Sequence, residues 1–119
     1  MSATNLKIRS DNWRSVEVTL GATKVAGAMD KIEDLVGVYM EGGDSGDEVA
    51  FCYDCEKITL PKSVDTGDVF AKGDKVYFDN SAKKLTATSG GNTLCGRALE
   101  AVIASDTEVL VDFKGNIEA

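Results

Sequence analysis

The feature of this chain that most constrains its fold is a set of short segments in which apolar and polar residues alternate. Val16, Val18 and Leu20 alternate with polar residues, and the same pattern returns at 76–78 and 109–113. A period of two places every second side chain on one face of a strand, whereas a helix needs a period near 3.6. Glycine-containing turn sequences separate these segments. The pattern predicts an all-β, β-rich fold: a small single-domain barrel or sandwich with at most one or two short helices.

Two segments depart from simple alternation. Between residues 49 and 60, apolar residues occupy odd positions from Val49 to Cys55 and then even positions from Ile58 onward. The odd-numbered set is expected to share one face, and the change of parity predicts a bulge near 54–57. Residues 35–40 have strand-like composition. The pattern at 28–33 fits a helix as well as a strand, and the residues alone do not decide between them.

Charge is unevenly distributed along the chain. The net charge is −7, with +2 in residues 1–16, −6 in residues 17–48 and −3 in the remainder. An acidic body repels phosphate groups, so we expect no nucleic-acid partner. No apolar run has the length of a membrane span, and the first residues lack the apolar centre of a signal peptide. We therefore expect no membrane partner, synthesis in the cytoplasm and no secretion.

The three cysteines raise the alternative of thiol chemistry. Cys52 and Cys55 have the spacing found in redox dithiols and zinc sites, and Cys95 lies 40 positions further on. A structural zinc site needs four ligands, and the chain has no histidine. On a strand, Cys52 and Cys55 would face opposite sides unless a bulge realigns them. We expect reduced thiols that fill the core, with no metal and no cofactor. The alternative is a small metal or redox protein that uses Cys52, Cys55 and Cys95.

Catalysis finds little support among the residues. Without histidine, a serine or cysteine nucleophile lacks its commonest base. The segment 67–75, GDVFAKGDK, has the wrong spacing for a phosphate-binding loop and no serine or threonine after Lys75. We therefore expect no enzymatic activity, and in particular no ATP-dependent one.

Several motifs follow one another in a fixed order in the second half of the chain. Residues 73–79 read GDKVYFD, residues 91–98 read GNTLCGRA, and residues 109–115 read VLVDFKG. Upstream, LVGVYM and ITLPK complete the set. Over most of residues 16–115 the chain resembles the capsid cement, or head-decoration, family of tailed phages. Some members are labelled recombinases, and the missing phosphate-binding loop argues against that label here. Cys95 stands where the family has an aliphatic residue, which favours a core position for this thiol.

The resemblance has implications for function and partners. It implies a non-enzymatic structural virion protein, often a trimer, that binds the outside of an assembled phage head and stabilises it. Its partners would be the major capsid protein of a tailed phage and further copies of itself. Its location would be the capsid surface of the virion, and the family has no catalytic residues to carry over. A tail or baseplate adaptor is a second alternative.

The candidate docking residues precede the first clear strand. We divide the chain into an N-terminal arm, residues 1–15, and a single β-rich domain, residues 16–119. The arm carries the basic residues and the only tryptophan. Tryptophan and arginine are enriched at protein interfaces because they bury much area at low entropic cost. The candidate capsid-docking residues are Lys7, Arg9, Trp13 and Arg14. The alternative for Trp13 is that it covers one end of the domain's own core.

Overall fold

Nine antiparallel strands form one sheet in the part of the chain that the computed structural model describes, residues 7–8 (backbone only) and 13–115. No helix occurs within these residues, and the predicted all-β fold is confirmed. The sheet order is β3–β4–β5–β9–β8–β6–β7, and β1 and β2 also pair with β5. The strands are β1 (Lys7–Ile8), β2 (Trp13–Thr19), β3 (Met29–Ile32), β4 (Leu35–Tyr39), β5 (Glu48–Pro61), β6 (Lys75–Asp79), β7 (Lys84–Thr86), β8 (Thr93–Ala98) and β9 (Glu108–Lys114).

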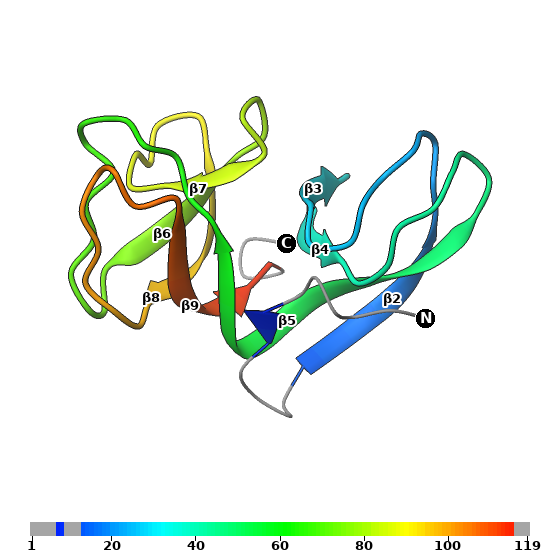
Figure 1. Cartoon of the computed structure of the whole chain (residues 1–119), viewed down its shortest axis with the longest axis horizontal. Coiled ribbons are helices and arrows are strands. Elements are labelled where there is room, and N and C mark those ends of the chain that lie inside the picture. Colours follow the sequence, from blue (N-terminus) through cyan, green and yellow to red (C-terminus); the bar gives the residue numbers. More distant parts are fainter. Residues whose placement is uncertain (1–6, 9–12, 116–119) are drawn as a thin grey trace.

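The long strand β5 belongs to both halves of the molecule (Figure 1). Its first half pairs with β2 and β4, and its second half pairs with β1 and β9. Strands β9, β8, β6 and β7 curl round on one side of the picture, and a parallel bridge between Lys62 and Leu85 connects β7 back to the end of β5. The Ser63 N–H donates to the Leu85 carbonyl at 2.8 Å. This half is therefore a small, nearly closed barrel.

Two bulges interrupt β5. Against β2, Arg14 pairs with Asp54 and Ser15 with Cys52, so Tyr53 is an extra residue. Against β9, the register shifts between Cys55 and Ile58, inside the predicted range 54–57. The predicted bulge is confirmed, and a second one lies beside it.

The bulges decide which side chains of β5 enter the core. Cys52, Cys55 and Ile58 all belong to the main core cluster, although simple alternation would separate Cys52 from Cys55. The expectation that the odd residues from Val49 to Cys55 share one face is wrong, because the extra residue reverses the alternation. Val49 packs in a second cluster. Every third residue of this part of β5, namely Cys52, Cys55 and Ile58, therefore enters the main core because of the two bulges and not because the segment is helical.

The undecided segment 28–33 is a strand followed by a turn. Strand β3 pairs with β4, and Ile32 lies opposite Leu35 across the two-residue turn Glu33–Asp34. Glu33 has a φ of 55° there, which closes the hairpin in the left-handed region. Among the described residues, no helix is long and apolar enough to cross a membrane.

The interior consists of two clusters. The main core fills the barrel and the concave face of β4 and β5, and it contains all three cysteines. The second cluster lies on the other face of the β2–β5–β4–β3 sheet and consists of Leu20, Tyr39, Val49 and Phe51. Gly115 connects the halves: its N–H donates to the Tyr53 carbonyl at 2.7 Å, and its carbonyl accepts from the Val36 N–H at 3.1 Å.

Candidate functional site

The four candidate docking residues do not form one site among the described residues. Strand β2 begins at Trp13, so the last three residues of the expected arm, 13–15, lie in the sheet. Trp13 and Arg14 are neighbours on that strand and therefore point to opposite faces. The Lys7 backbone pairs with Thr59 in β1, but its side chain and all of Arg9 lie outside the described residues. Trp13 is 40% exposed, so at most it covers part of its own core.

Arg14 neutralises a buried carboxylate of its own domain. Its Nη2 lies 2.6 Å from Asp54 Oδ2, and Lys114 Nζ lies 3.2 Å from Asp54 Oδ1. The guanidinium also lies over the Tyr53 ring, 5.7 Å from its centroid. Burial acts to raise the pKa of Asp54, but the two cations outweigh it and hold that pKa below its usual range. The cluster joins β2, β5 and β9 beside Tyr53, the extra residue of β5.

The three cysteines belong to the main core cluster. All three are free and buried. Burial raises the pKa of the Cys52 thiol to about 11 and also raises that of Cys55, so both are protonated at neutral pH. Among residues 13–115, the structure brings together no group of three or more histidine, cysteine, aspartate or glutamate side chains suited to a metal ion.

An exposed apolar surface lies at the barrel, where two loop segments meet. Phe70 and Val102 exchange backbone hydrogen bonds of 3.2 and 3.0 Å, and both side chains point into the core. Their neighbours along each segment therefore point outward. The apolar platform is the set of exposed residues Val69, Ala71, Ala101 and Ile103.

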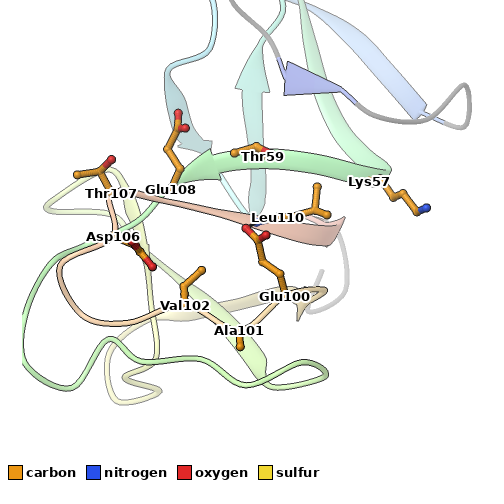
Figure 2. Close-up of a pocket in the computed structure, with 9 residues that line it drawn as sticks. All are labelled: Lys57, Thr59, Glu100, Ala101, Val102, Asp106, Thr107, Glu108 and Leu110. Carbon is orange, nitrogen blue, oxygen red and sulfur yellow. Dashed lines mark hydrogen bonds between the residues drawn. The ribbon is translucent and has the colours of Figure 1, made fainter.

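An open groove of about 750 Å³ adjoins this platform (Figure 2). It lies between the outer face of the β5–β9 pair, at Thr59 and Leu110, and the loop that carries Glu100 and Asp106. The Leu110 N–H donates to Glu100 Oε2 at 3.0 Å, which fixes this carboxylate against the strand. Glu108 adds a third acidic side chain, whereas Lys57 at one end is the only basic residue of the lining. We call this the acidic groove.

Sequence reasoning missed both surfaces. The segments around Phe70 and Val102 are short apolar runs that suggest core, and only the pairing of the two segments shows which residues point outward. One signal was available in the turns that follow. Asp74 and Asp106 are each the fourth residue of a glycine- or serine-containing turn that starts at a platform residue, and their carboxylates accept from the N–H of that first residue.

Fold and surfaces together define a class: a small all-β protein with an exposed apolar platform and an acidic groove beside it. The comparison with protein families then assigns it. The model of the phage cement protein family matches residues 10–113, and the chain belongs to that family. No significant match was found among curated proteins or among solved structures. The family is a structural one of the phage capsid, which agrees with the resemblance seen in the motifs.

Proposed function

We propose that this protein binds the outer surface of an assembled phage head and stabilises it, without catalysing a reaction. The observation that carries the proposal is the family match over residues 10–113. The structure supports it with a barrel whose loops present an apolar platform and an acidic groove to the outside. The protein would be made in the cytoplasm of the bacterial host and then reside on the capsid surface of the virion.

The proposed mechanism is addition of buried area between capsid subunits. A protein that contacts two neighbouring subunits adds interface across their joint, so the joint resists the pressure of packaged DNA more strongly. A trimer would suit a three-fold position of the head and would hold several joints at once. Simultaneous contacts of this kind increase the overall affinity without any single strong contact.

Two alternatives are separated by direct observations. The thiol alternative requires accessible thiolates, whereas Cys52 and Cys55 are buried with raised pKa values. A thiol reagent should therefore react with the folded protein far more slowly than with the protein in urea, and fast reaction when folded would favour this alternative. A tail or baseplate adaptor would be found in purified tails instead of purified heads.

The experiment that tests the proposal uses phage heads that lack this protein. Purified protein is added to them, bound protein is measured by co-sedimentation, and DNA release is followed on heating. We expect saturable binding and a higher temperature of DNA release. Heads that bind nothing, or that bind it and release DNA at the same temperature, would refute the proposal.

A further inference from the structure

The apolar platform brings two of the exposed large apolar side chains of the described residues together. Val69 is 53% exposed and Ile103 is 62% exposed, and they lie opposite each other next to the Phe70–Val102 bridge. Ala71 and Ala101 lie opposite each other on its other side, so the four residues form one continuous patch. Clustered exposed apolar residues of this kind mark contact sites more often than single ones do.

The turns beside the platform are held in place before any partner binds. The Ala71 N–H donates to Asp74 Oδ2 at 2.8 Å, and the Asp74 N–H donates back to the Ala71 carbonyl at 3.1 Å. Ile103 and Asp106 repeat this arrangement at 3.0 and 3.1 Å. Two reciprocal bonds fix each turn, so little conformational entropy remains to be lost on binding.

A buried lysine holds one of these turns against the end of β5. Lys62 is 1% exposed, and its Nζ donates to the carbonyls of Ser63, Ala104 and Asp106 at 2.7, 3.0 and 3.1 Å. The ammonium group thus connects the segment after β5 to the turn that follows Ile103. The platform is a preformed surface, which is what a docking site requires.

The charge around the platform specifies the partner. The platform and the acidic groove share Ala101. The Glu100 and Asp106 carboxylates accept from the backbone N–H groups of Leu110 and Ile103, and the Lys62 ammonium bonds to the Asp106 carbonyl and not to its carboxylate. Two copies meeting through this surface about a two-fold axis would bring the same acids together, which is unfavourable. The surface therefore fits a basic partner better than a second copy of itself.

We infer that the apolar platform and the acidic groove together form the docking surface for a capsid-protein segment that carries aliphatic side chains next to lysine or arginine. The aliphatic side chains cover Val69 and Ile103, and the basic side chains lie along the groove at Glu100 and Asp106. This inference rests on the proposed function and names the surface through which it operates. It places the main contact on the barrel, away from Trp13 and the basic arm.

The first test replaces the platform. The double variant Val69→Asp/Ile103→Asp puts charge on exposed positions, so the fold should be retained, and urea denaturation checks this. The control is Val25→Asp, because Val25 is 64% exposed but lies in the loop between β2 and β3. We expect the double variant to bind heads lacking the protein roughly tenfold more weakly or worse, and the control to bind like wild type.

The second test addresses the charge. Glu100→Gln keeps an oxygen that accepts from the Leu110 N–H but removes the negative charge. The control is Glu33→Gln on the exposed β3–β4 turn. We expect Glu100→Gln alone to weaken head binding and to reduce its dependence on salt concentration.

Each outcome decides the inference. If the folded double variant binds heads with wild-type affinity, the platform is not part of the docking surface. If Glu100→Gln binds heads with wild-type affinity and wild-type salt dependence, the bound segment is not basic. A double variant that changes the oligomeric state but still binds heads like wild type would assign the platform to a contact between copies, and it would also overturn the inference. If the wild-type protein itself does not bind heads, the proposed function is refuted together with the inference. In the other cases the wild-type protein still binds heads, and only the inference is refuted.

Discussion

At the scale of single residues, two glycines are required by close packing of backbone against backbone. A Cβ built on Gly115 would lie within bond-like distance of the Val36 carbonyl oxygen, and one built on Gly96 would overlap the Asp112 carbonyl oxygen. Neither neighbour is a flexible side chain that can move aside. The close approach at Gly96 occurs where β8 pairs with β9. That Gly115 contacts β4, which lies far away in sequence, was not predictable from the motif.

Replacing Gly115 with alanine should destabilise the fold strongly. The added Cβ forces β9 away from β4 and breaks the two hydrogen bonds that Gly115 makes with Tyr53 and Val36. We expect a loss of about 3 kcal/mol or more in the free energy of unfolding, measured by urea denaturation. Gly67→Ala is the matched control, because nothing lies within 4 Å of its Cβ position. Equal stability of the two variants would show that β9 is free to shift at this point.

Asp30 should contribute to stability in a way that depends on pH. Burial acts to raise its pKa, but the Lys83 ammonium and the Tyr39 hydroxyl, with Nζ to Oδ1 at 2.8 Å and Oη to Oδ2 at 2.6 Å, lower it to about 2. A pKa lower in the folded than in the unfolded state stabilises the fold above the unfolded value near 3.8, and this contribution is lost as the pH falls towards 2.

The variant Asp30→Asn isolates this contribution. We expect it to be less stable than wild type at pH 7 and the difference to shrink as the pH falls from about 4 to about 2, followed through the urea midpoint. Asp34→Asn, on the exposed β3–β4 turn, serves as the control. A difference between wild type and Asp30→Asn that stays constant over this range would mean that the ion pair has no net effect on folding.

At the scale of elements, the sequence was most informative where alternation was uninterrupted. Strands β2, β6 and β9 follow from their period of two, and the parity change in β5 correctly predicted a bulge. The second bulge, at Tyr53, leaves no mark in composition, because an extra residue in a strand need not be polar. The sequence did not predict the platform for a related reason. Which residues of a short apolar run face outward depends on the segment with which the run pairs.

The contact between the end of β5 and the 103–107 loop should depend on Lys62. Lys62→Met removes a buried ammonium and leaves the carbonyls of Ser63, Ala104 and Asp106 without this donor. We expect a loss of about 2–4 kcal/mol in the free energy of unfolding, together with faster amide exchange in residues 103–107. Lys72→Met, at an exposed position, is the control. Unchanged exchange in the loop would show that the Phe70–Val102 bridge holds it without the lysine.

At the scale of the whole molecule, family membership indicates a structural role in the phage capsid. The net charge of −7 makes association between copies depend on the salt concentration. Like charges repel, so acidic proteins associate more readily as salt rises. Association would be further favoured when a capsid holds several copies close together.

The family resemblance leads us to expect a homotrimer, at least on the capsid. Light scattering at increasing protein concentration should show mass rising from one towards three chains of 12.6 kDa, more readily at high salt. Deleting residues 1–12, which removes β1, tests the arm separately: if the arm docks on the capsid, the truncated protein stays folded and binds heads more weakly. The trimer would be excluded if the protein is a monomer in solution and is also found on the head as single, isolated copies.

Strand β9 is the last of the described strands along the chain, yet it lies between β5 and β8 in the sheet. A ribosome makes the other strands first, and until β9 emerges the second half of β5 lacks the neighbour that joins it to β8. Gly115, which bonds to both Tyr53 and Val36, emerges later still. A nascent chain that stops before residue 108 therefore has an open sheet with unpaired edges, which invites aggregation. The barrel is complete only after translation has passed residue 115, so the docking surface proposed here requires the last described strand and Gly115 to have been made.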